Sequence, residues 1–100
     1  MTIVIRYRAA KDIIESTGFL HSRRPSSAVK FTERLNRAME ILARSPQSGA
    51  DLGLVYKGLR IRSMAIRGFQ NYLILHAPHG DDVIIARVVD GRRDLAALLS

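Results

Sequence analysis

The last third of the chain contains three short β-like runs that follow one another with only turn residues between them. We expect strands over about residues 58–66, 71–77 and 82–89, separated by Gly68 and by the Pro78–Asp82 segment. Connections this short join antiparallel neighbours, because a parallel pair needs a crossover of about a dozen residues or more. The sequence therefore predicts a three-stranded antiparallel meander on which the rest of the chain packs.

The first half of the chain is predicted to form a strand and a pair of helices. Residues 2–8 are rich in β-branched and aromatic side chains and predict a strand. Residues 9–21 predict an amphipathic helix with Lys11, Asp12 and Glu15 on its outer side. A second helix is expected to run from Pro25 to about Ser45. The predicted inner positions are Ala10, Ile13, Ile14, Thr17 and Leu20 in the first helix, and Ala28, Phe31, Leu35, Ala38, Met39 and Leu42 in the second.

The remaining segments complete an α+β fold. Pro46–Gly49 is typical of a turn, residues 50–57 are interpreted as a loop, and residues 93–99 can form a short C-terminal helix. We expect one domain over residues 1–100, in which an antiparallel sheet, made of the N-terminal strand and the meander, packs on a two-helix hairpin. Leu95, Leu98 and Leu99 of the short helix are expected to point inward.

Composition excludes several classes of site. The 100 residues include no cysteine, so neither a disulfide framework nor a thiolate metal site is expected. His21, His76 and His79 lack the spacing of metal ligands, and we expect neither a metal nor another cofactor. No apolar stretch approaches the ~20 residues that span a membrane, and no signal peptide is visible.

The net charge of +7 favours an acidic partner, which can be nucleic acid, an anionic surface or an acidic protein. Residues 1–45 carry nine basic and four acidic side chains, whereas residues 58–100 carry six and four. The helices therefore hold more of the excess charge than the arginine-rich meander does.

Strand alternation predicts one cationic face of the sheet. If the wholly apolar strand positions face the helices, a set of polar side chains shares the opposite face. Such a face suits a phosphate-bearing or other macromolecular partner, although it can also be a solvated face whose long side chains only cover apolar neighbours. The set comprises Arg60, Arg62, Tyr72, His76 and Arg87, with Arg92 and Arg93 near its edge.

The second helix offers another surface. Lys30, Arg34, Arg37 and Arg44 form a basic stripe with Ile41 in its middle, and Val29 also lies off the apolar face. A stripe of this kind is often only a solvated helix face. Apolar anchors with a charged rim instead suggest a docking surface, and an acidic segment that folds on binding would suit it.

Several short motifs, taken together and in order, resemble the RelE/ParE superfamily of small toxins from bacterial toxin–antitoxin pairs, and its ParE branch in particular. The resemblance rests on Ala28, Phe31, Leu35, Leu42, Pro46 and Gly49, on Gly58-Leu-Arg60 and Asn71-Tyr-Leu-Ile74, and on the run from Arg87 through Gly91-Arg-Arg-Asp to Leu95. It implies a bacterial cytoplasmic toxin that has a cognate, acidic ParD-like antitoxin as its partner and DNA gyrase as its target. The residues of the cationic face would then contact the target, and Val29, Arg34, Arg37 and Ile41 the antitoxin.

The resemblance leaves a second activity open. RelE-like members share the fold but cut mRNA in the ribosome, with basic side chains and a Tyr or His near the C-terminus. Here neither Tyr nor His follows Arg93, and Asp90 stands where the family's final strand usually ends in His. We therefore assign no catalytic residue and favour gyrase inhibition. The alternatives are a ribosome-dependent endoribonuclease, in which arginines 60, 62 and 87 stabilise the phosphorane, and an inactive relative that only binds.

Overall fold

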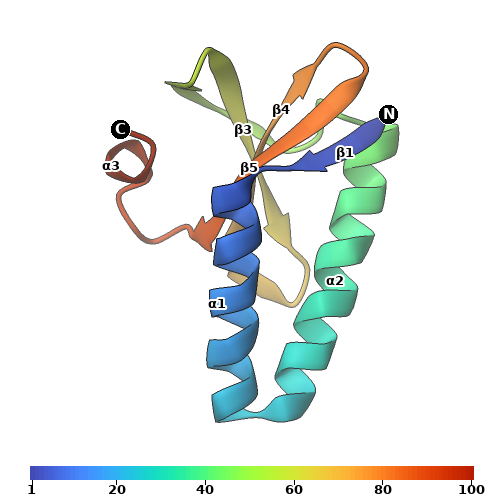
Figure 1. Cartoon of the computed structure of the whole chain (residues 1–100), viewed down its shortest axis with the longest axis vertical. Helices are drawn as coiled ribbons and strands as arrows, with labels where there is room; N and C mark the ends of the chain where they lie inside the picture. Colours follow the sequence, from blue (N-terminus) through green and yellow to red (C-terminus); the bar gives the residue numbers. More distant parts are fainter.

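The chain folds into a five-stranded sheet with a helical hairpin on one face and a short C-terminal helix on the other (Figure 1). The computed structural model describes residues 1–100. In chain order the elements are β1 (Thr2–Ile5), α1 (Tyr7–Arg23), α2 (Pro25–Arg44), β2 (Ala50–Tyr56), β3 (Leu59–Ile66), β4 (Phe69–His79), β5 (Asp82–Asp90) and α3 (Leu95–Leu98).

The strand order is β1-β5-β4-β3-β2, so the predicted meander β3–β4–β5 and the α+β class are confirmed. The sheet is mixed, because β1 pairs parallel to β5 while every other pair is antiparallel. The interpretation of residues 50–57 as a loop is wrong, since they form β2 and pair with β3. Leu52, Leu54 and Tyr56 pack at every second position, with Gly53 and Val55 between them and Asp51 before them. Apolar side chains do alternate along this segment, but Asp and Gly are rare in strands, so the segment resembled a loop.

One core lies between the helical hairpin and the sheet. Phe31 of α2 is fully buried at its centre, and its ring meets those of Phe69 and Tyr72 edge to face, with centroids 5.3 and 5.1 Å away. The α2 positions predicted to face inward are buried or half-buried, as predicted. The 3.6-residue period of α2 therefore accounts for how the hairpin packs.

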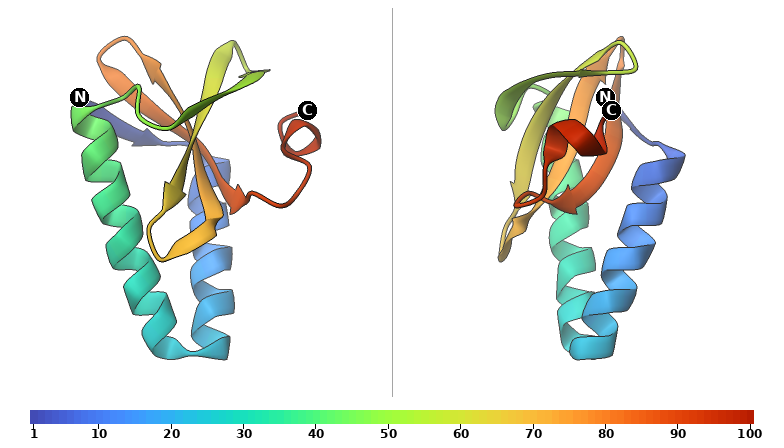
Figure 2. Two further views of the ribbon diagram at one scale, coloured as in Figure 1. Left: turned by 180° about the vertical axis from the view of Figure 1, so that it is seen from behind. Right: turned by 90° about the vertical axis from the view of Figure 1, so that its left-hand side faces the viewer.

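A second core lies on the opposite face of the sheet, where side chains of β2 and of the C-terminal segment pack against β3, β4 and β5 (Figure 2). Leu59, Ile61 and Leu75 belong to it, so the prediction that these apolar strand positions face the helices is wrong. Both faces of the central strands are buried, and alternation alone could not say which face the hairpin covers. Leu95, Leu98 and Leu99 pack into this second core, as predicted.

Four boundary and facing predictions for the N-terminal half need correction. The first strand ends at Ile5, and α1 begins at Tyr7 rather than Ala9. Asp12, predicted on the outer side of α1, is only 5% exposed, whereas Ile14, predicted inside, is 72% exposed. The side of α1 that faces the sheet is therefore rotated relative to the predicted one. No helix in the fold is long and apolar enough to cross a membrane.

Candidate functional site

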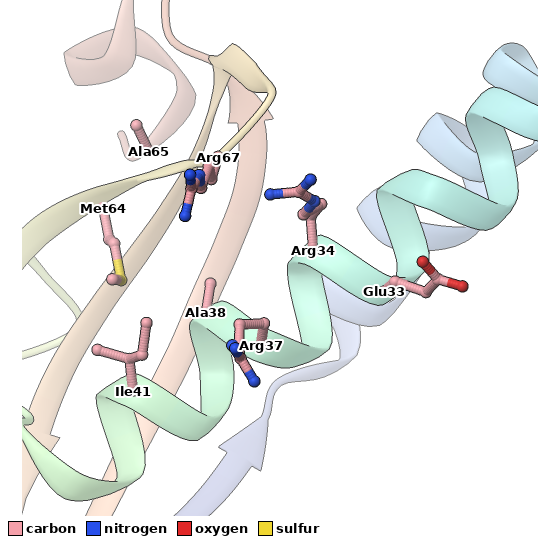
Figure 3. Close-up of a pocket in the computed structure, with 8 residues that line it drawn as sticks. All are labelled: Glu33, Arg34, Arg37, Ala38, Ile41, Met64, Ala65 and Arg67. Carbon is pink, nitrogen blue, oxygen red and sulfur yellow. The ribbon is translucent and has the colours of Figure 1, made fainter.

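A groove of about 490 Å³ lies between α2 and the end of β3 (Figure 3). Ile41 and Met64 point toward each other across it, and Ala38 lies beside Ile41 along α2. These apolar side chains make one end of the groove, and the arginines lie toward its other end. The residues around it are Glu33, Arg34, Arg37, Ala38, Ile41, Met64, Ala65 and Arg67.

The groove carries an excess of unpaired positive charge. Arg34, Arg37 and Arg67 line it, and none of them lies within ion-pair distance of a carboxylate. Glu33 is the acidic side chain at its rim. Arginine presents a planar fork of donors that matches a carboxylate, so a groove with three unpaired guanidinium groups and an apolar end suits an acidic, partly apolar segment.

Three of the four residues predicted to bind the antitoxin, Arg34, Arg37 and Ile41, line this groove together. Val29 does not line it and is 61% exposed elsewhere on α2. The sequence reasoning missed Met64 and Arg67, the contributions of β3 and its turn. Helix periodicity could place one wall of the groove, but only the packing of α2 beside β3 places the other.

The predicted cationic face of the sheet does not exist as one surface. In the sheet register Arg62 pairs with His76, and His76 with Ile85, which packs in the core beneath the helices. Arg87 instead pairs with Leu75, which belongs to the opposite core. An irregularity in the β4–β5 register separates the two pairs. The side chains of Arg62 and Arg87 therefore start on opposite faces of the sheet.

Two of these arginines bond to the start of β2 and to the residue before it. Arg60 donates from Nε to Asp51 Oδ2 at 2.8 Å, and this ion pair is exposed. The pKa of the Asp51 carboxyl is lowered, first by the backbone N–H of Gly53 and then by Arg60. Arg62 donates from Nη2 to the carbonyl oxygen of Gly49 at 3.0 Å. Arg60 and Arg62 of β3 thus attach the start of β2 to β3.

His76 is fully buried in β4, and neither of its ring nitrogens has a hydrogen-bond partner. Burial lowers its pKa to about 4, and the positive charge of Arg62 adds to that effect, with the backbone of Ser48 opposing it. The ring is therefore neutral near pH 7. A side chain with no solvent exposure cannot contact a phosphate-bearing partner, so His76 does not belong to a binding surface.

Arg87 forms a buried ion pair with Asp12 of α1. Its Nε donates to Asp12 Oδ2 at 2.7 Å, its Nη2 to Oδ1 at 3.0 Å, and its Nη1 to the carbonyl oxygen of Leu98 at 3.3 Å. Asp12 also accepts from the backbone N–H of Val88 at 3.1 Å. The pKa of Arg87 is raised, first by its hydrogen bonds to Asp12. This side chain joins α1, β5 and the C-terminal segment and is not available to a ligand.

The other predicted target-binding residues differ in exposure. Tyr72 is half-buried and packs on Phe31 beneath the helices. The side chain of Arg92 donates two hydrogen bonds to Asp90, at 3.0 and 2.6 Å, and its backbone N–H donates a third at 2.9 Å. The side-chain bonds are the first cause that lowers the pKa of Asp90 to about 2. Arg93 is exposed and has no ion-pair partner. No group of three or more His, Cys, Asp or Glu side chains is arranged to hold a metal ion.

Comparison with known proteins identifies the family. The family described as the ParE toxin of the type II toxin–antitoxin system parDE matches residues 3–95. No protein with a curated description matches the sequence. Among solved structures, the chromosomal ParDE toxin–antitoxin system from P. aeruginosa contains a chain with the same fold, with a TM-score of 0.73 and 16% identity over 90% of this chain and 95% of that one. The chain belongs to the family of ParE toxins and is the toxin component of a type II toxin–antitoxin system.

Proposed function

We propose that this toxin inhibits DNA gyrase by direct binding, without an enzymatic step of its own, and that an acidic ParD-like antitoxin neutralises it in the bacterial cytoplasm. One observation carries the choice against a nuclease. The side chains that a phosphate-cleaving site would use are already engaged within the fold, with Arg87 bound to Asp12 and His76 fully buried.

The ribonuclease alternative would need several cations to converge on one phosphate, because they must stabilise charge at a single developing phosphorane. Arg62 and Arg87 start on opposite faces of the sheet, and Arg60 is paired with Asp51. A general acid or base must also reach the reacting atom. His76 is fully buried, and Tyr72 is half-buried with its ring packed against Phe31.

The groove between α2 and β3 supports the proposed antitoxin site. Its three unpaired arginines and its apolar end match an acidic amphipathic segment. For gyrase, we favour the exposed residues Arg92 and Arg93, which adjoin each other after β5. Arg93 has no ion-pair partner, whereas Arg92, like Arg60, is paired with an aspartate at the surface. Antitoxin and target would then bind at different places on the toxin.

The test is inhibition of purified gyrase by the purified toxin. We expect loss of DNA supercoiling with the wild-type chain, and an inhibitory concentration raised roughly tenfold or more in Arg92→Ala/Arg93→Ala, since anchors at an interface dominate its affinity. The matched control is Arg23→Ala/Arg24→Ala, which removes two adjacent exposed arginines at the distant turn between α1 and α2 (Figure 1). We expect this control to inhibit like the wild type.

Expression in cells without the antitoxin separates the two activities. Filamentous cells with gyrase-dependent DNA breaks are the expected result. An immediate stop of translation with codon-positioned mRNA cuts would instead favour the endoribonuclease. Absence of any growth effect would favour a relative that only binds.

A further inference from the structure

The outer edge of β3 is open where the strand borders the groove. β2 pairs with β3 from Leu59 to Ser63, but β3 continues to Ile66. The chain enters β2 through Gly49, which lies so close to Ser63 that a Cβ there would overlap the Ser63 carbonyl oxygen. From Met64 onward, no strand of this chain therefore covers the side of β3 that faces away from β4.

An open strand edge can bind another chain. In an antiparallel sheet the backbone N–H and C=O groups point alternately toward the two neighbours, so an edge strand leaves half of them unpaired. Met64, Ala65 and Arg67 present this edge to the groove, and α2 forms the opposite wall. About four residues of an added strand, ~13 Å in length, would cover it.

The chemistry around this edge selects the occupant. Arg34 and Arg37 on α2 and Arg67 next to the edge have no acidic partner in the fold, whereas Arg60, Arg87 and Arg92 elsewhere each have one. Ile41 and Met64 provide an apolar strip between the two walls. On an incoming strand, every second side chain would face α2. Apolar side chains at these positions beside Ile41 and Met64, and acidic ones beside Arg34 and Arg37, would satisfy the strip and the arginines together.

We propose that an acidic, extended segment of the antitoxin adds to the sheet as a sixth strand along Met64–Ile66 of β3 and the adjoining Arg67, with its carboxylates on Arg34, Arg37 and Arg67. This inference rests on the proposed antitoxin partnership and states its binding mode. A helix in the groove would satisfy its own backbone and leave the β3 edge unpaired, whereas an added strand satisfies both.

The first test is amide hydrogen exchange on the complex of this toxin with the product of the neighbouring reading frame. The amides of residues 64–67 that point away from β4 should exchange roughly 100-fold or more slowly in the complex, because each gains a backbone acceptor. Unchanged exchange at these amides, in a complex that does form, overturns strand addition and leaves the antitoxin partnership standing. If the two proteins form no complex at all, the proposed partnership itself fails.

The second test changes charge at the groove. We expect Arg34→Glu/Arg37→Glu to weaken antitoxin binding roughly 100-fold or more, since it places like charges beside the incoming carboxylates. The control is Lys11→Glu/Arg23→Glu, which makes the same change in net charge at exposed positions of α1. It should weaken binding by about threefold or less, through long-range attraction alone. Equal losses in the two variants would overturn the groove as the site, and circular dichroism verifies that both variants fold.

Discussion

At the scale of single residues, the Asp12–Arg87 ion pair shows how a motif that resembles a functional arginine can be structural. Both side chains are about 5% exposed, and the two oxygens of Asp12 accept from Arg87 and from the Val88 backbone. A buried charge is tolerated only when it is paired, so loss of one partner leaves the other uncompensated.

We therefore expect Asp12→Ala to lower the free energy of unfolding by about 3–5 kcal/mol, because Arg87 remains buried without its carboxylate. Urea denaturation near pH 7 measures the change. Glu15→Ala removes an exposed carboxylate of the same helix and should cost less than about 0.5 kcal/mol. Asp12→Leu/Arg87→Met, which removes both charges, should lose less stability than Asp12→Ala. A loss of less than about 1 kcal/mol in Asp12→Ala would contradict the buried pair.

His76 predicts a dependence of stability on pH. Its pKa lies at about 4 in the folded protein and at 6.5 in the unfolded chain, so the unfolded state binds more protons in between. Stability is then full above about pH 7 and falls as the pH drops from about 6.5 to about 4, by up to about 3 kcal/mol. Urea denaturation at several pH values measures the loss.

The variant His76→Leu should flatten this part of the pH profile, because it removes the group that titrates. His79→Gln, an exposed position in the same strand, serves as the control and should leave the profile unchanged. A profile that is equally steep in His76→Leu would assign the effect to other groups. The hydrogen bonds of Asp51 and Asp90 lower the pKa of both carboxyls, so their contribution is lost at still lower pH.

At the scale of elements, the entry to β2 depends on a glycine. Gly49 has a φ of +85°, and an added Cβ would overlap the carbonyl group of Ser63 in β3. Gly68, in the β3–β4 turn, has the same φ of +85° but open space where its Cβ would lie. Substitutions at these two glycines therefore separate the loss of stability caused by the backbone conformation from the loss caused by the steric overlap.

We expect Gly68→Ala to destabilise the fold by about 1–2 kcal/mol, the cost of the left-handed conformation for an L-residue. Gly49→Ala should cost about 2 kcal/mol more than that, because β2 must also move away from β3. Thermal and urea denaturation of the two variants measure both values. Equal losses would mean that β2 shifts at no cost and that the close approach of Gly49 to Ser63 is not tight.

The elements also differ in how far the sequence predicted them. The helix α2 was predicted almost to the residue, because twenty residues of regular period average out local exceptions. The strand β2 was missed, because seven residues with Asp51 and Gly53 among them resemble a loop. The sequence predicted the wall of the groove that α2 forms with Arg34 and Arg37. It did not predict the wall formed by β3 and its turn, because no periodicity in the sequence places β3 beside α2.

At the scale of the whole molecule, the net charge of +7 attracts an acidic antitoxin from a distance, whereas the groove binds it only after the two proteins touch. Association with an acidic antitoxin should accordingly depend on salt mainly through its rate. We expect the association rate constant to fall roughly tenfold between about 50 and about 500 mM NaCl, and the dissociation rate constant to change less than about threefold. Surface plasmon resonance measures both constants. Association that does not change with salt would contradict steering by the net charge.

The sequence by itself determined the elements with a clear local period, the α+β class, the preference for an acidic partner and the resemblance to ParE toxins. These properties depend on residues close in the chain or on sums over the whole chain. Only the tertiary structure decided which arginines are free. Asp12 and Arg87 are 75 positions apart, and Arg67 reaches the groove only because β3 packs beside α2. Folding brings together side chains that are distant in the chain, and these contacts decide whether an arginine is paired with a carboxylate or free to bind another protein. The local sequence around each arginine does not reveal these contacts.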